Sequence, residues 1–252
     1  LRLMEIDFPI EITTFADIPA GTGLGSSSSF AVGLMHALYA LKGQFVTKYT
    51  LAESAAKIEV SILKRTMGKQ DHFAAAYGDL NVLTFHANEK VTVEPIFCSP
   101  KAHSKLESNL LLFYTKLKRD ASEVLQVQNR QTSQKRAVLR EMKNLVTPLR
   151  EALSENGDLN QVGEILHENW QLKKSLTGII SSSEIDEYYI KARRAGAIGG
   201  KLLGAGGGGF LMFYVEPEKQ KSVVDALNGL FHFQVGLDTS GTRITYYDQT
   251  DK

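Results

Sequence analysis

The sequence predicts an α/β fold, because segments with strand periodicity alternate with segments of helical periodicity along one chain. The 252 residues are 43% hydrophobic and 23% charged, which is an ordinary globular composition. Residues 81–85 and 90–96, NVLTF and KVTVEPI, predict paired strands joined by the turn HANE. Apolar residues spaced by three and four from Phe30 to Leu41 predict an amphipathic helix, which Gly43 would end.

Further strands and helices are expected on both sides of these segments. Residues 9–19, PIEITTFADIP, alternate apolar and polar side chains and predict a strand before the first helix. Leu51 to Ile62 predict a second helix, and residues 121–194 are expected to be mostly helical. For the remainder we expect strands within 109–115, 199–215, 231–235 and 242–247, and a helix over 218–227.

Charge, hydropathy and cysteine content exclude several classes of protein. The formal net charge of +1 is far from the basic balance of a nucleic-acid binder, so no nucleic-acid partner is expected. No apolar run reaches the length of a membrane span, so no membrane partner is expected. Cys98 is the single cysteine, which rules out an internal disulfide and favours a reducing, cytoplasmic location. The first residues lack an initiator Met and a signal-peptide pattern, so we expect the chain to begin inside a longer protein.

The stretch PAGTGLGSSSSF, residues 19–30, is rich in glycine and serine and lies between a predicted strand and a predicted helix. Free N–H groups and the helix macrodipole make such a helix start suitable for an anion. Serine hydroxyls can bind phosphate oxygens or Mg²⁺, which prefers oxygen ligands. A nucleotide triphosphate is therefore the expected ligand. The alternative is a tight connection, which needs one or two glycines rather than this many.

Two other phosphate-binding patterns fit poorly. A Walker A loop needs a lysine after its glycines, and none follows residues 21–25. The second glycine run, GAGGGG at 204–209, satisfies G-x-G-x-x-G, but the next residues, FLMFYV, predict a strand rather than the helix of a dinucleotide fold. We therefore expect this run to pack its backbone closely against a loop or a ligand.

A carboxylate near the acceptor hydroxyl would serve a kinase, either by accepting the proton or by orienting the nucleophile. Asp71, in GKQDHFAAAYG, is the strongest candidate, and Glu59 on the preceding helix is a candidate metal ligand. Lys69 is a candidate catalytic residue that would lower the pKa of Asp71 or neutralise developing charge. Equally open is a helix cap at Asp71 with a solvated Glu59.

The three segments PAGTGLGSSSSF, GKQDHFAAAYGDLN and GGKLLGAGGGGF resemble, in order and separation, those of the GHMP kinases. Together with RDASEVLQVQ and HENWQLKKSL, they look most like the D-glycero-D-manno-heptose 7-phosphate kinase branch of that superfamily. The resemblance covers essentially the whole chain. It implies ATP-dependent transfer of the γ-phosphoryl group to a sugar hydroxyl, with Mg²⁺, most specifically to the anomeric hydroxyl of that heptose phosphate.

The resemblance also implies site residues. Ser27 and Glu59 would bind Mg²⁺, Asp71 would act on the acceptor hydroxyl, and Arg119, Lys173 or Lys174 would contact the phosphate of the sugar. For each of these three, an exposed basic residue on a helix is the alternative interpretation. The ATP phosphates would be wrapped by Gly21, Gly23, Leu24, Gly25, Ser26, Ser27, Ser28 and Ser29, and that loop would be braced by Gly204, Ala205, Gly206, Gly207, Gly208 and Gly209.

The same resemblance implies two lobes: an N-terminal, mixed-sheet phosphate-loop lobe over residues 1–98 and a helical, ferredoxin-like lobe over 99–252. The family's N-terminal GGGTD-like segment is absent here, so we expect an incomplete first lobe. Two alternatives remain open. The chain could be another GHMP kinase, for fucose, galactose or a mevalonate derivative, or a non-catalytic nucleotide- or sugar-binding fragment. A homodimer is considered, but the sequence does not decide it.

Overall fold

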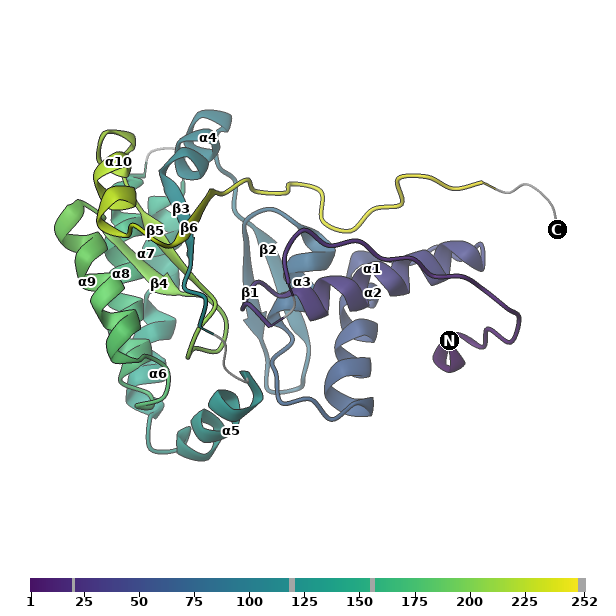
Figure 1. Cartoon of the computed structure of the whole chain (residues 1–252). Helices are drawn as coiled ribbons and strands as arrows, with labels where there is room; N and C mark the ends of the chain where they lie inside the picture. Colours follow the sequence, from purple (N-terminus) through teal and green to yellow (C-terminus); the bar gives the residue numbers. More distant parts are fainter. Residues whose placement is uncertain (20, 118–120, 155–156, 249–252) are drawn as a thin grey trace. The chain divides into compact units, whose positions relative to one another are not determined.

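The computed structural model describes residues 1–19, 21–117, 121–154 and 157–248 (Figure 1). The chain divides into two compact units. The first comprises the described residues of Leu1–Ala20, Gly25–Asp79 and Asp238–Lys252, and the second comprises Gly21–Leu24 and Leu80–Leu237. These units do not coincide with the division predicted at residues 98 and 99. Residues 21–24 and 80–98 group with the second unit, and residues 238–248 group with the first.

The first unit is helical. It contains the short 3₁₀ helix η1 (Arg2–Met4), the helices α1 (Ser26–Leu41), α2 (Lys48–Ala56) and α3 (Gln70–Tyr77), and the π-helical η2 (Lys57–Ile62) that continues α2. The predicted helices are thereby confirmed, and Gly43, with φ of +66°, follows the end of α1 as expected. Helices α1, α2 and α3 pack on one another. Buried alanines on α2 allow the backbones to approach closely: Ala52, Ala55 and Ala56.

Two predicted strands are wrong. Residues 9–19 and 242–247 form no strand, and the described part of the first unit contains none. An extended segment becomes a strand only when a neighbour pairs its N–H and C=O groups. Near the C-terminus the backbone bonds instead to the end of α3: Thr242 N donates to Ala75 O at 3.0 Å, and Asp79 N donates to Asp238 O at 2.7 Å.

The second unit contains both sheets. The hairpin of β1 (Asn81–Phe85) and β2 (Val91–Pro95) pairs Asn81 with Pro95, as predicted. It is antiparallel, so a mixed sheet, as predicted for residues 1–98, is not found in their described part. The other elements follow in chain order: α4 (Pro100–Asn109), β3 (Leu110–Tyr114), α5 (Ala121–Gln131), α6 (Arg136–Asn144), α7 (Val146–Ala152), α8 (Asn160–Lys174), α9 (Ser183–Ala195), β4 (Gly199–Leu202), β5 (Phe210–Tyr214), α10 (Pro217–Ala226) and β6 (Phe231–Gln234).

The larger sheet has the order β4-β5-β3-β6, and all its neighbouring strands are antiparallel. Helices connect β3 to β4 and β5 to β6, whereas a glycine loop connects β4 directly to β5. This order and connectivity are those of a ferredoxin-like fold. The predicted α/β class is therefore confirmed. Because β5 follows the glycine loop, the helix that a dinucleotide-binding loop requires is not present there.

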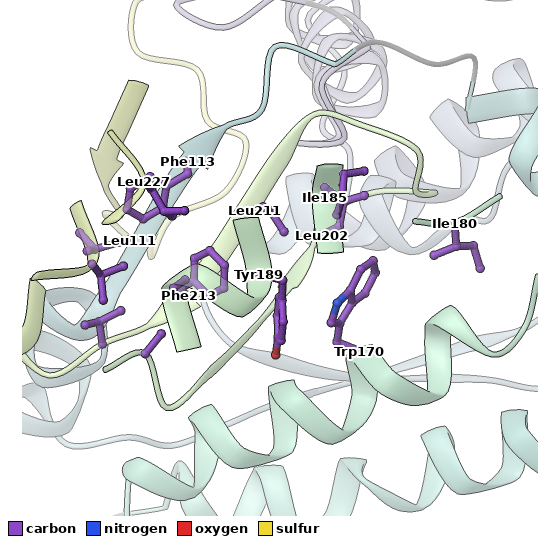
Figure 2. Close-up of a cluster of buried hydrophobic side chains, with 14 of the residues drawn as sticks. Leu111, Phe113, Trp170, Ile180, Ile185, Tyr189, Leu202, Leu211, Phe213 and Leu227 are labelled. Atoms are coloured by element: carbon purple, nitrogen blue, oxygen red, sulfur yellow. The ribbon is translucent and has the colours of Figure 1, made fainter. Parts of the chain in front are cut away.

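Alternate side chains of the central strands enter two apolar clusters, as the two-residue period of a strand requires. Figure 2 shows the larger cluster, in which the Tyr189 ring lies 5.5 Å from Phe213 and 6.2 Å from Trp170 between ring centroids. Trp170 comes from α8 and Tyr189 from α9, so this cluster holds both helices against the sheet. In the part of the chain that is described, no helix is long and apolar enough to cross a membrane.

Candidate active site

The glycines of the first loop adopt backbone conformations that side chains disfavour. Gly21, Gly23 and Gly25 have φ of +79°, +83° and +68°, all in the left-handed region. Leu24 lies between the last two. Residues Gly21–Leu24 belong to the second unit, and the loop continues from Gly25 in the first unit. The glycine spacing is thus required by the local backbone, whatever the loop binds.

Within the second unit, the first loop and the second glycine loop touch through their backbones. A Cβ atom on Gly23 would lie 2.9 Å from the carbonyl oxygen of Leu203, and one on Gly209 would lie 2.2 Å from that of Thr22. Side chains at these positions would therefore collide with main chain. The expected role of residues 204–209 in bracing the phosphate loop agrees with this packing and remains a proposal.

The remaining members of the second loop contact their own unit. Gly207 N donates to Ile180 O at 2.9 Å, and a Cβ atom on Gly208 would lie 2.4 Å from Leu117 O. Ala205 packs against the larger apolar cluster. The loop that begins at Gly204 is therefore held on several sides, which suits a rigid support.

In the first unit, Asp71 lies beside the start of α1. Gly25 is the N-cap residue of this helix, and Ser29 N donates to Gly25 O at 2.9 Å. A Cβ atom on Gly25 would lie 3.4 Å from Cβ and Cγ of Asp71, which is partly buried on α3. Ser26 is the first residue of α1, so Asp71 lies beside the residue that precedes the first turn, whose N–H groups have no partner within the helix.

Glu59 is buried, with 3% of its surface exposed, and it accepts hydrogen bonds from several side chains. Ser27 Oγ donates to its Oε1, Ser28 Oγ lies 3.4 Å from its Oε2, and His72 Nε2 lies 2.7 Å from the same Oε2. Burial alone would raise the pKa of the Glu59 carboxyl group. The hydrogen bonds from Ser27 and His72 and the charge of Arg65 outweigh burial and lower this pKa. Glu59 is therefore an ionised buried carboxylate, not the solvated one of the alternative interpretation.

The oxygens of Ser27 and Glu59 suit a cation. Arg65 Nη1 lies 2.5 Å from both Ser27 Oγ and Glu59 Oε1, so a positive group already contacts the two oxygens expected to bind Mg²⁺. The described residues contain no group of three or more His, Cys, Asp and Glu side chains that could hold a metal. Mg²⁺ tolerates such a sparse site because phosphates and water complete its six oxygen ligands.

The candidate basic residues differ in their surroundings. Lys69, the N-cap residue of α3, forms an ion pair with Glu53 at 3.7 Å. Lys174 forms an ion pair with Asp186 at 3.0 Å, whereas the Lys173 amine donates to the carbonyl oxygen of Gly204 at 2.5 Å. Arg119 lies outside the described residues.

Sequence reasoning missed His72 and Arg65, which contact Glu59, and Lys201, whose amine donates to Asn169 Oδ1 at 3.1 Å. His72 adjoins Asp71 in the sequence, but only the packing of α3 turns its ring toward Glu59. Lys201 was detectable as the one charged side chain in the otherwise small and apolar strand GGKL.

Two domains that characterise one enzyme family match parts of this chain. The GHMP kinases N terminal domain matches residues 1–79, and the GHMP kinases C terminal domain matches residues 149–232. The chain therefore belongs to the GHMP kinase family.

Its relatives include sugar and sugar-phosphate kinases. The D-glycero-alpha-D-manno-heptose 7-phosphate kinase of Campylobacter jejuni is 32% identical over 216 residues, which cover 85% of this chain and 63% of that protein. The galactokinase of Pyrococcus furiosus is 30% identical over 241 residues, with coverages of 84% and 66%. The crystal structure of a D-glycero-D-manno-heptose 1-phosphate kinase from Bacteroides thetaiotaomicron matches with a TM-score of 0.68 and 30% identity, over 90% of this chain and 64% of that one. This chain thus spans just under two thirds of the length of the heptose kinases that it matches.

Proposed function

We propose that this chain carries out ATP-dependent phosphoryl transfer to a sugar hydroxyl, most specifically the anomeric hydroxyl of D-glycero-D-manno-heptose 7-phosphate. Membership of the GHMP kinases and similarity to two heptose phosphate kinases support this proposal. The observation that carries it is the position of Asp71 against Gly25, at the start of α1. A carboxylate beside a helix start that can bind an anion is what phosphoryl transfer to a hydroxyl needs.

In the proposed mechanism, the backbone and hydroxyl groups of residues 21–29 bind the phosphates of ATP. Ser27 and Glu59 would hold Mg²⁺, and the low pKa of Glu59 keeps its carboxylate charged for that purpose. Mg²⁺, when bound, neutralises negative charge that develops on the transferring phosphoryl group. His72 orients Glu59 through its hydrogen bond, and Arg65 would have to leave the shared oxygens when a metal ion binds.

Asp71 is proposed to hold the acceptor hydroxyl and to take its proton, or to orient it, as the oxygen attacks the γ-phosphorus atom. Lys69 begins the helix that carries Asp71 and is proposed to supply positive charge beside it. Arg119, Lys173 and Lys174 are proposed contacts of the phosphate on the sugar. Among them, Lys173 is favoured over Lys174, because Asp186 already neutralises Lys174.

The test is turnover by the purified chain with ATP, Mg²⁺ and a panel of acceptors: heptose 7-phosphate, galactose, fucose and mevalonate. Asp71→Asn should lower kcat by about 10²- to 10⁴-fold, the usual contribution of a positioned acid or base. Asp7→Asn, at an exposed aspartate of the same unit, is the matched control and should leave kcat unchanged. Unaltered turnover in Asp71→Asn would remove Asp71 from the mechanism.

Two other outcomes define the alternatives. Preferential phosphorylation of galactose would favour a galactokinase activity, which the Pyrococcus furiosus relative supports. ATP binding without product from any acceptor would favour a nucleotide- or sugar-binding protein. We further propose a cytoplasmic location, since a single cysteine fits a reducing compartment. A homodimer remains a prediction, which light scattering of the purified chain can test.

A further inference from the structure

Two lysines of the second unit extend partly buried amines into one small region. Lys173 lies in the last turn of α8, and its Nζ donates to Gly204 O at 2.5 Å. Lys201 lies on β4, and its Nζ donates to Asn169 Oδ1 at 3.1 Å. Asn169 and Lys173 are about one helical turn apart and share one side of α8. Both amines therefore lie where α8 faces β4 and the glycine loop that follows it.

Among the described residues, these two amines have no carboxylate partner. None of the ion pairs among the described residues includes Lys173 or Lys201. Their contacts are a carbonyl and an amide oxygen, each of which uses one of the three N–H groups of an ammonium. Lys174 differs, because it forms an ion pair with Asp186 and lies 5.8 Å from the centre of the Trp170 ring.

Two neighbouring ammonium groups, partly removed from water and without a counter-charge, are unfavourable in the absence of a ligand. The pKa values agree with this unfavourable arrangement of charge. Burial, and then the charge of Lys201, lower the pKa of Lys173 to about 7. Burial also lowers the pKa of Lys201. A dianion bound between the amines would remove the repulsion and use their remaining N–H groups.

The surroundings indicate the class of anion. Gly204, which accepts from Lys173, begins the loop that packs against Gly23 of the proposed phosphate loop. We propose that Lys173 and Lys201 form a binding site for a terminal phosphate group. The phosphate belongs either to the acceptor sugar phosphate or to ATP. The naming of a sugar phosphate or ATP as the source of this phosphate rests on the proposed kinase function. The binding of a phosphate group by the two lysines does not rest on that function.

The first experiment measures inorganic phosphate binding by ³¹P NMR titration, without ATP or sugar. The double variant Lys173→Met/Lys201→Met should weaken binding at least tenfold, and each single variant should weaken it several-fold. Lys221→Met, at an exposed lysine of the same unit paired with Asp225, is the matched control. Lys173→Arg/Lys201→Arg keeps both charges and should retain binding, so loss of charge is separated from misfolding. Equal phosphate affinity in the wild type and the double methionine variant, or no phosphate binding by the wild type, would overturn the proposal.

A second titration by calorimetry distinguishes the two sources. If the acceptor supplies the phosphate, the double methionine variant loses affinity for heptose 7-phosphate but not for unphosphorylated heptose or ATP. If ATP supplies it, the variant loses affinity for ATP but not for ADP. Either result supports the site, and affinities for all four ligands equal to those of the wild type would overturn it. A chain that binds phosphate here but turns over no acceptor would fail the proposed function and keep this site.

Discussion

Two regions of the molecule bury charged groups in different ways. One is the region around Glu59 in the first unit, and the other is the region around the second glycine loop in the second unit. Glu59 is an ionised carboxylate whose oxygens contact Ser27, His72 and Arg65. Lys173 and Lys201 are partly buried cations beside a loop of close-packed backbone, and in the described part of the chain their partners are neutral oxygens. A neutralised cluster stabilises the folded chain by itself, whereas an uncompensated one gains stability when an anion binds.

The largest expected loss of stability comes from removing the carboxylate of the neutralised Glu59 cluster. Glu59→Ala leaves the ring of His72 without its hydrogen-bond partner in the interior, so the first unit should lose about 3 kcal/mol of stability. Glu94→Ala is the matched control, because Glu94 and Arg150 form an exposed ion pair at 3.2 Å. It should cost less than about 1 kcal/mol. Urea unfolding followed by circular dichroism measures both, and equal losses would show that the Glu59 cluster is no stronger than a surface pair.

The next largest loss of stability is expected when a side chain is added to the second glycine loop. Gly209→Ala adds a Cβ atom 2.2 Å from Thr22 O at a φ of +99°, so it should cost about 2 kcal/mol. Gly21→Ala has a similar positive φ but no atom within 4 Å, and it should cost about 1 kcal/mol. The fluorescence of Trp170, the single tryptophan, reports unfolding of the second unit. If both variants unfold alike, the contact with Thr22 contributes nothing.

A smaller effect is expected from the uncompensated charge of Lys173, which should make the stability of the folded chain depend on pH. The pKa of Lys173 is about 7 in the folded chain and 10.5 as the ordinary value. Between pH 7 and 10.5 the unfolded chain therefore binds more protons, and stability rises with pH; below pH 7 both states are protonated and the gain is absent. The full shift corresponds to about 4 kcal/mol over this range. Because the amine is only partly buried and water screens its charge, the wild type should gain about 1–2 kcal/mol from pH 7 to 10 relative to Lys173→Met. Trp170 fluorescence in urea tests this. A constant difference, like that expected for Lys221→Met, would contradict it.

The smallest effect on stability is expected from removing the exposed arginine of the Glu59 cluster. Arg65 is 51% exposed, so Arg65→Ala should change stability by less than about 1 kcal/mol. Because Arg65 contacts the same oxygens of Ser27 and Glu59 that are proposed for Mg²⁺, its removal should tighten Mn²⁺ binding a few-fold, measured by electron paramagnetic resonance. Arg150→Ala, at a similarly exposed arginine, should leave Mn²⁺ affinity unchanged. Weaker binding in Arg65→Ala would mean that Arg65 supports the cation site rather than competing for it.

Much of the secondary structure was predictable, but its pairing was less so. Apolar periodicity located α1, α8 and the hairpin of β1 and β2, because these patterns repeat within a turn or a strand pair. The same periodicity wrongly predicted strands at 9–19 and 242–247, since alternation shows that a segment could pair and not that a partner exists. The candidate site shows the same limit: Glu59 was singled out from its position, but its contact with His72 was not.

By itself, the sequence determined the α/β class, the membership of the GHMP kinases, and the location of the two glycine-rich loops. These properties depend on residues close together in the chain, or on motifs whose order the chain preserves. Only the tertiary structure decided that Asp71 lies beside Gly25, that Glu59 is charged while buried, and that Lys201 adjoins Lys173. The physical reason is that burial and charge neighbours arise from the packing of elements distant in sequence, and these set the electrostatic free energy of each group.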